Sequence, residues 1–278
     1  MAVNLVFLAC AIGARYEKFL PPFIFFALKH NPNNWVEVVV RDKAKFEIGY
    51  EKTLDLLKRE GFINFHVREF RVSPGRHFAN TYRFLEVPET QSTYTYIPDV
   101  DIMFLKDVAE AYSFPWPDPR LPYNNSIRPS KKRSLTGLHF VKTKQYFIPK
   151  LLDLQAKIAI QSGRKENDEI ILTKLCTKTF GLPHKHWRHK PKLEKTMVDN
   201  LGIHFSPNRG PNKRVPLRVS GGNFEKFLDL EKEYFEIFKT PCFARLSHQL
   251  KNWFLVDHKS AEKYQELVSR DLKIFKNK

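Results

Sequence analysis

The sequence contains few cysteines and no apolar run long enough to cross a membrane. Only three cysteines occur among 278 residues, at positions 10, 176 and 242, and no two stand at a metal-binding or redox spacing. This scattered set argues against a disulfide framework and fits a reducing compartment, so we expect a cytoplasmic protein. The most apolar run, FLPPFIFFAL (19–28), is too short for a transmembrane helix and contains two prolines.

The first ten residues, MAVNLVFLAC, share only their apolar character with a signal peptide. They lack the basic segment with which a signal peptide begins. We therefore expect a buried first strand here. The sequence also lacks internal repeats and low-complexity tracts.

Acidic residues are scarce relative to basic ones. The chain has 47 Lys and Arg against 30 Asp and Glu, a net charge of +17. Such an excess favours anionic partners, namely nucleotides, nucleic acids or acidic membrane surfaces, and says nothing about the fold. The excess is uneven, because residues 185–218 hold nine basic and two acidic residues, and residues 119–144 hold seven basic and none acidic.

The remaining composition is typical of a globular protein. Apolar residues make up 42% of the chain, and its length suits one large α/β domain, or one domain with a small extension. Aromatic residues make up 14%, with 24 Phe, 10 Tyr and 4 Trp. A Phe-rich core and a surface that stacks sugars or bases both fit this excess, and composition does not choose between them.

Strand and helix patterns alternate through the first hundred residues. The periodicity predicts strands at 3–12, 35–42, 64–72 and 93–104, and helices at 21–31, 49–61 and 76–88. This alternation indicates a mixed, mostly parallel sheet with flanking helices.

The later part of the chain is less regular. We expect a loop at 113–133, a strand at 134–143, and helices at 146–161, 167–180, 224–238 and 262–275. The last two helices are expected to pack on the domain, although docking on a membrane surface is open. We predict one domain at 1–222 and a helical extension at 223–278.

Two carboxylates interrupt the apolar stretch YIPDVDIMF (96–104). If this stretch is extended throughout, Asp99 and Asp101 point to one side of it. Two such carboxylates repel each other, and a divalent cation such as Mg²⁺ or Mn²⁺ removes the conflict. Ligands of open α/β sheets bind beyond the carboxyl ends of strands, where this pair is expected. The structural alternative is a pair of surface aspartates on a turn after Pro98.

Two other classes of protein use similar features. Haloacid-dehalogenase-type phosphatases also carry Asp-x-Asp, but near their first strand and with Thr or Val at the position of Met103, so this class is disfavoured. A metal-dependent nuclease stays open because the positive charge suits DNA or RNA.

The order of short motifs resembles the nucleotide-sugar glycosyltransferases of the GT-A fold, above all family 8, the glycogenin and lipopolysaccharide galactosyltransferase group. The resemblance covers roughly residues 3–215. The motifs are FLACAIGARY (7–16), NTYRFLE (80–86), YIPDVDIMF (96–104), LTGLHFV (135–141), NDEIIL (167–172) and GIHFSPNRGPNKR (202–214).

The resemblance implies a role for each motif. It places Asp99, Asp101 and His204 on a Mn²⁺ ion, with Mg²⁺ as the alternative, and Asp168 and Glu169 at the reaction centre. His with two carboxylates suits Mn²⁺. The residues that the resemblance assigns to the donor are Ala11, Arg15, Tyr16, Arg83, Asp99, Val100, Asp101, Gly137, Arg209 and Lys213.

The sequence departs from the family pattern at three places. Leu135 stands where the family has Asn, Glu169 stands where it has Gln, and the spacing from His204 to Lys213 is stretched. The stereochemical outcome therefore stays open, and Arg214 is an alternative to Lys213. Our hypothesis is that Asp168 or Glu169 orients or deprotonates the acceptor hydroxyl.

The sequence thus predicts a metal-dependent transfer of sugar from a nucleotide-sugar donor, with UDP first, to a hydroxyl of a glycan, glycolipid or glycoprotein. A nuclease or nucleic-acid-binding protein and a non-catalytic glycan-binding protein are the alternatives. The sequence predicts no oligomeric state.

Overall fold

The computed structural model describes residues 3–75, 79–104, 107–113, 116, 118–125, 134–160, 166–183 and 202–204. The strands are β1 Val3–Cys10, β2 Trp35–Val40, β3 Phe65–Glu69, β4 Ser92–Ile97, β5 Ile102–Phe104, β6 Tyr123–Asn124, β7 His139–Lys142 and β8 Gly202–His204. The helices are α1 Ala14–Glu17, α2 Leu20–His30, α3 Lys43–Arg59, the 3-10 helix η1 Ala79–Phe84, α4 Val108–Ser113, α5 Thr143–Tyr146, α6 Pro149–Ile160 and α7 Asp168–Thr179.

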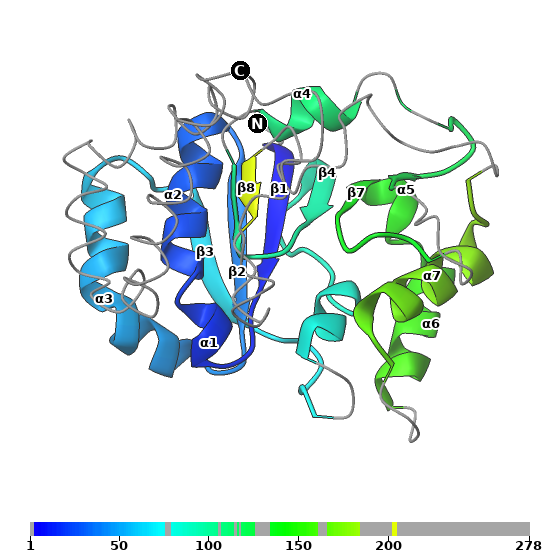
Figure 1. Ribbon diagram of the computed structural model, residues 1–278, viewed down its shortest axis with the longest axis horizontal. Helices are drawn as coiled ribbons and strands as arrows, with labels where there is room; N and C mark the ends of the chain where they lie inside the picture. The colour runs from blue at the N-terminus through cyan, green and yellow to red at the C-terminus, as the bar shows by residue number, and fades with distance from the viewer. Residues whose placement is uncertain are drawn as a thin grey trace, which may run out of the picture.

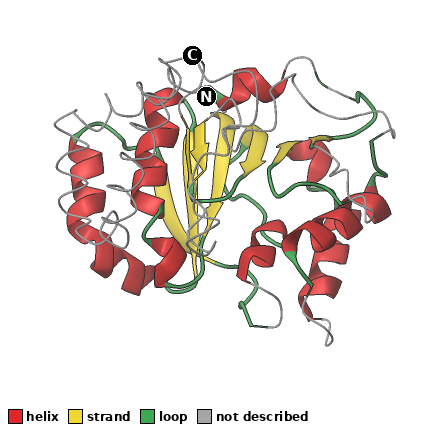
Figure 2. Ribbon diagram, in the orientation of Figure 1, coloured by secondary structure: helices red, strands yellow, loops and turns green. Residues whose placement is uncertain are grey.

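The fold is mixed α/β, with helices on both faces of a mostly parallel sheet (Figures 1 and 2). The six strands follow the order β3-β2-β1-β4-β7-β6, and β5 pairs separately with β8. Strands β3, β2, β1 and β4 are parallel, which confirms the predicted mostly parallel sheet, whereas β7 runs antiparallel to both of its neighbours, β4 and β6. The strand order reverses beside β1, and such a reversal opens a crevice at the carboxyl ends of the strands.

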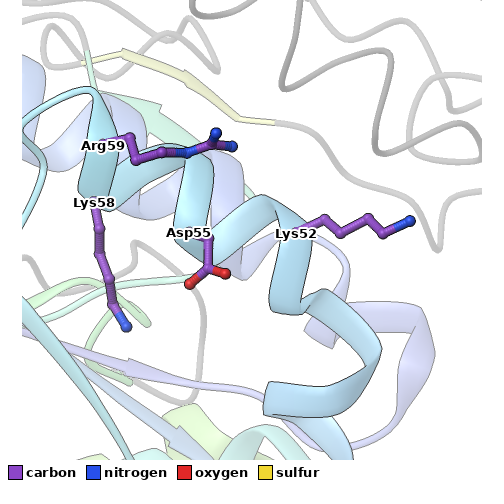
Figure 3. Close-up of a pocket in the computed structure, with 4 residues that line it drawn as sticks. All are labelled: Lys52, Asp55, Lys58 and Arg59. Atoms are coloured by element: carbon purple, nitrogen blue, oxygen red, sulfur yellow. The ribbon is translucent and has the colours of Figure 1, made fainter.

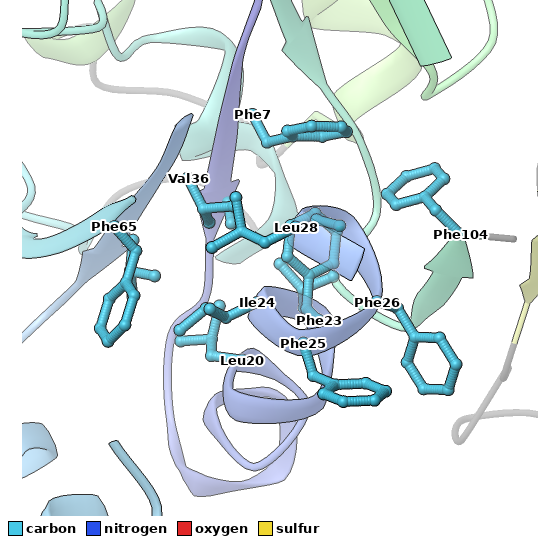
Figure 4. Close-up of a cluster of buried hydrophobic side chains, with 14 of the residues drawn as sticks. Phe7, Leu20, Phe23, Ile24, Phe25, Phe26, Leu28, Val36, Phe65 and Phe104 are labelled. Carbon is cyan, nitrogen blue, oxygen red and sulfur yellow. The ribbon is translucent and has the colours of Figure 1, made fainter. Parts of the chain in front are cut away.

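One face of the sheet is covered by α2 and α3 through a Phe-rich core (Figure 4). Helix α2 has Pro21 and Pro22 in its first turn, which suits their fixed backbone. Its Phe23 meets Phe7 of β1 edge-to-face at 6.1 Å, and Phe104 of β5 lies 5.4 Å from Phe7. This core therefore fixes β5, and the turn before it, against β1.

The other face packs against η1, α6 and α7. Tyr82, Phe84 and Leu85 form a second core with Leu172 and Leu175 of α7. All five side chains are buried. The second core consequently joins η1 to α7, two segments far apart in the sequence.

Three predicted elements differ from the observed ones. Within the predicted helix at 76–88 the structure describes the 3-10 helix η1, and the predicted helix at 146–161 begins later, as α6 at Pro149, after the separate short helix α5. Helix α3 starts at Lys43 rather than residue 49, because the Asp42 carboxylate caps it by accepting from Lys45 N at 2.9 Å.

The predicted strand at 93–104 is also wrong as a continuous strand. It ends at Ile97, and the segment from Pro98 to Asp101 forms a turn before β5. Asp99 and Asp101 therefore do not share one face of a strand, and the turn sets how their side chains lie relative to each other.

The predicted extension at 223–278 lies outside the described residues, and the domain boundary stays a prediction. Within the described part of the chain, no helix combines the length and apolar character needed to span a membrane.

Helix α3 carries a surface pocket lined by Lys52, Asp55, Lys58 and Arg59 (Figure 3). All four residues belong to one helix and are charged. None of them is among the site residues predicted from the sequence.

Replacing Gly13 with alanine is expected to destabilise the protein by about 1–3 kcal/mol, because Gly13 adopts a backbone conformation that a side chain strains. Its φ and ψ are 83° and 152°, and its N–H donates to Glu17 Oε1 at 2.9 Å. Chemical denaturation measures the change. Gly49→Ala is the matched control, since Gly49 is exposed within α3 and this change is expected to add about 0.5–1 kcal/mol of stability. A Gly13→Ala variant as stable as the wild type would show that the backbone at Gly13 does not require a glycine.

Candidate active site

Arg83 of η1 joins three segments at the carboxyl end of β4. Its Nη1 donates to the main-chain oxygen of Pro98 at 3.0 Å and to the Asp99 carboxylate. Its Nη2 donates to Asp168 Oδ2 at 2.7 Å. One guanidinium therefore ties η1 to the aspartate turn and to the first turn of α7.

The surroundings of Arg83 hold it as a fixed cation. Its side chain is buried, and its guanidinium lies 4.7 Å from the ring of Phe84. Burial opposes the charge, but Asp99 and then Asp168 more than offset this effect and raise the pKa of Arg83. Among the described residues, Arg83 Nε is a buried donor without a hydrogen-bond partner.

Gly137 lies so close to Arg83 that a larger residue does not fit without movement. A Cβ atom at this position would stand 2.6 Å from Arg83 Nη2 and 3.7 Å from Asp168 Oδ2. The glycine therefore lets the main chain approach the ion pair, a use to which glycine is suited. The structure thus brings Gly137, Arg83 and Asp168 together.

The second aspartate of the turn adjoins strand β8. Asp101 is only 6% exposed, whereas the Asp99 side chain is 30% exposed. Ile102, directly after Asp101, pairs with His204 in the antiparallel ladder of β5 and β8. Opposed residues in such a ladder have Cα atoms about 4.5–5.5 Å apart. The main chain of His204 is therefore next to the aspartate turn.

The described side chains by themselves do not complete a metal site. No group of three or more His, Cys, Asp or Glu side chains gathers among them, and the side chain of His204 lies outside this description. Asp99 and Asp101 thus supply two carboxylates in one short turn.

The other predicted residues fall at several places. Ala11 is buried just beyond β1, and Arg15 and Tyr16 belong to α1, where Tyr16 packs against the first core. Val100 is buried in the first core. The residues outside the described part are Arg209 and Lys213.

Helix α7 begins at the reaction centre that the motifs predict. The Asn167 side chain caps it by accepting from Ile170 N at 2.9 Å. Asp168 and Glu169 occupy the first turn, and acidic residues are stabilised at this end of a helix. Asp168 faces Arg83, whereas the main-chain oxygen of Glu169 accepts from Thr173 Oγ1 at 2.6 Å.

No motif predicts a role for two residues beside the site, the buried Asn125 and the half-buried Thr136. Asn125 follows β6 and accepts from Thr136 N at 3.0 Å, next to Gly137. The only available signal was a pair of asparagines in a segment expected to be a loop.

Acid is expected to destabilise the protein through His139, which is buried in β7. Burial, and then the nearby Arg83, lower the pKa of His139 from 6.5 to about 3. The unfolded chain thus binds a proton below pH 6.5 that the folded chain does not. The free energy of unfolding should fall by up to about 1.4 kcal/mol for each pH unit between those values.

Urea denaturation of the wild type and of His139→Gln between pH 7 and pH 4 measures this contribution. Other titrating groups are common to both proteins, so the difference between the two slopes isolates His139. Parallel slopes would contradict a histidine that stays neutral in the folded protein.

Comparison with solved structures finds glycosyltransferases. GlyE of Streptococcus pneumoniae matches with a TM-score of 0.44 and 14% identity over 65% of this chain and 45% of its own. Galactosyltransferase LgtC, in complex with donor and acceptor sugar analogues, matches with a TM-score of 0.42 and 14% identity over 62% and 70% of the two chains. These matched proteins are GT-A glycosyltransferases, the group that the sequence motifs resemble.

A third match covers almost the whole chain. The mannosyltransferase PcManGT of Pyrobaculum calidifontis, in complex with GDP-Man and Mn²⁺, has a TM-score of 0.42 and 11% identity over 99% of this chain and 81% of its own. No protein-family model and no curated protein sequence matches this chain. This chain spans less than half the length of GlyE, and likenesses at these scores assign no residue a role.

Proposed function

We propose that this protein is a divalent-metal-dependent glycosyltransferase that moves a sugar from a nucleotide-sugar donor to a hydroxyl group. The observation that carries the proposal is the Arg83 bridge between Asp99 in the aspartate turn and Asp168 at the start of α7. Of the two bridged carboxylates, Asp99 is suited to bind a cation and Asp168 is suited to bind an acceptor hydroxyl. Both lie at the carboxyl end of the sheet, where ligands of such folds bind.

The residues around the aspartate turn fit a divalent cation. Asp99 and Asp101 supply hard oxygen ligands, and the pairing of β5 with β8 supports His204 as a third ligand. A nitrogen ligand beside two carboxylates favours Mn²⁺ over Mg²⁺. The bound cation would neutralise charge on the departing nucleoside diphosphate.

The chain's own residues orient the reacting groups. Arg83 fixes the carboxylates of Asp99 and Asp168, and this fixed arrangement needs little rearrangement when charge develops. We assign to Asp168, or to its neighbour Glu169, the orientation or deprotonation of the acceptor hydroxyl. Tyr16, with Ala11 and Arg15, is assigned to the nucleotide, and the basic residues Arg209 and Lys213 to the diphosphate.

The donor is proposed to be a UDP-sugar, and GDP-sugars are its main competitors. The acceptor is proposed to be a glycan, a glycolipid or a glycoprotein.

Release of UDP or GDP from a panel of nucleotide sugars, with Mn²⁺ and with EDTA, tests the proposal. Release should require Mn²⁺ and should be lost in Asp101→Asn, while the surface variant Asp55→Asn keeps it.

The two alternatives give distinct results in parallel assays. Cleavage or tight, salt-sensitive binding of DNA or RNA, without any nucleotide release, would indicate a nucleic-acid enzyme or binding protein. Binding on a glycan array without donor turnover would indicate a non-catalytic glycan-binding protein. Either result would overturn the transferase proposal.

A further inference from the structure

The side-chain amide of Asn125 holds the main chain that approaches Arg83. Asn125 Oδ1 accepts from Thr136 N at 3.0 Å and from Thr136 Oγ1 at 2.7 Å. Asn125 Nδ2 donates to Thr136 O at 3.0 Å and to His139 Nδ1 at 2.9 Å. We name this group of Asn125, Thr136 and His139 the Asn125 clamp.

The Asn125 clamp uses the full hydrogen-bonding capacity of the amide. A primary amide offers two N–H donors and two oxygen lone pairs, and each has a partner here. Because Thr136 N–H is a donor, the atom facing it must be the oxygen, which fixes the orientation of the amide. Asn125 is 2% exposed, so these bonds are made in the interior, where an unpaired polar group is costly.

The clamped segment leads directly to the ion pair. Gly137 follows Thr136. A Cβ atom on Gly137 would stand only 2.6 Å from Arg83 Nη2, so the Cα of Gly137 lies directly against the guanidinium. From the other direction, Leu135 N donates to Thr173 Oγ1 of α7 at 2.8 Å. The segment is therefore held between β6 and α7 with its glycine against the guanidinium.

We propose that Asn125 is a positioning residue for sugar transfer. It acts through Thr136 and Gly137 to hold the Arg83 guanidinium at hydrogen-bonding distance from the Asp168 carboxylate. The proposal rests on the proposed function, since it concerns the rate of the same transfer. Within the described part of the chain, the hydrogen-bond partners of Asn125 are Thr136 and His139, so any effect on Arg83 is indirect. It fixes the surface against which the guanidinium lies, and the Arg83 to Asp168 bond depends on that surface.

The first test compares Asn125→Ala with Asn124→Ala. Asn124 is the matched control because it is equally buried, at 1% exposed, but its Nδ2 donates to Tyr112 O at 2.8 Å rather than to the clamped segment. Misplacement of a catalytic group by about 1 Å lowers rates by about a hundredfold. We expect Asn125→Ala to lower kcat by about 10- to 100-fold with donor KM within about threefold, and Asn124→Ala to leave kcat unchanged.

A merely structural role for Asn125 would give a different pattern. Both variants would then lose thermal stability without a selective loss of kcat, and the proposal would be overturned. If Asn125→Ala does not fold, Thr136→Ala removes the Oγ1 bond to Asn125 Oδ1, together with a longer contact to Leu138 O at 3.5 Å, and Gly137→Ala displaces Arg83 directly. Both should lower kcat in the folded enzyme, and unchanged kcat in these two variants would also overturn the proposal.

A second readout does not depend on sugar transfer. The side-chain N–H resonances of Arg83, assigned by NMR in the wild type, should shift in Asn125→Ala and stay in place in Asn124→Ala. If the wild type transfers no sugar but these shifts occur, the proposed function fails and the Asn125 clamp stands. If the Arg83 resonances do not respond to Asn125→Ala, the clamp fails even when sugar transfer is found.

Discussion

Replacing Arg83 with lysine is expected to lower kcat for sugar transfer by about 100- to 1,000-fold, the range typical of losing a preorganised electrostatic contact. The planar guanidinium reaches Pro98 O, Asp99 and Asp168 at once, and a lysine ammonium lacks this fork geometry. Because lysine keeps the positive charge, the loss of kcat measures the contribution of the guanidinium's fixed orientation. Steady-state kinetics with the donor identified by the nucleotide-sugar panel measures it.

The control for this variant is Arg71→Lys. Arg71 is exposed and contacts Glu86 through its main-chain N–H, which lysine retains. Its kcat should match that of the wild type. An Arg83→Lys enzyme that keeps at least a third of the wild-type kcat would show that the bridge is not needed for the reaction.

Replacing Arg68 with methionine is expected to lower the free energy of unfolding by about 3–5 kcal/mol, because it leaves two buried carboxylates without their cation. Arg68 Nε lies 2.6 Å from Glu37 Oε1, and Arg68 Nη1 lies 2.7 Å from Glu86 Oε2. Both glutamates are fully buried. Burial raises the pKa of Glu86, and Arg68 counters this rise. Urea denaturation at pH 7 measures the loss.

Two further variants separate loss of the cation from loss of packing. The triple change Arg68→Met, Glu37→Gln and Glu86→Gln removes the uncompensated charges and should recover part of the stability. Arg59→Met on the surface of α3 should change it by less than about 0.5 kcal/mol. If Arg68→Met costs no more than Arg59→Met, the buried network does not stabilise the fold.

This network also bears on the site, because Glu86 comes three residues after Arg83. Besides Arg68, Glu86 accepts from Arg71 N at 2.9 Å. Glu37 accepts from Glu89 N and Thr90 N in the segment that leads to β4. The network therefore anchors the chain directly after η1, at Glu86, and the segment that leads to β4.

Local patterns predicted most of the sheet, and they pointed to the residues that we propose for the site. The apolar runs of β1 and β2 and the helical spacing of α2 are properties of short stretches, so they are visible in the sequence. The aspartate pair and Gly137 were visible because cation binding and close approach each need particular residue types. Their roles stay predictions until the kinetic experiments are done.

Other features depend on contacts between distant segments. The Arg83 to Asp168 bond joins residues 85 positions apart, and the pairing of Ile102 with His204 spans a still longer separation. The 3-10 form of η1 and the turn at Pro98 arise where these contacts override the local helix and strand patterns. The buried amide of Asn125 left only a pair of asparagines as a local signal, and asparagines in a polar stretch are ordinarily predicted to be in a loop.

The most direct test of the central claim is the metal dependence of nucleotide binding at the aspartate turn. Isothermal titration of UDP and GDP into the wild type and Asp101→Asn, each with Mn²⁺ and with EDTA, measures it. The account predicts that the wild type binds one of these nucleotides at least about tenfold more tightly with Mn²⁺, and that Asp101→Asn loses this gain. Equal binding with Mn²⁺ and EDTA, or no binding of either nucleotide, would contradict it.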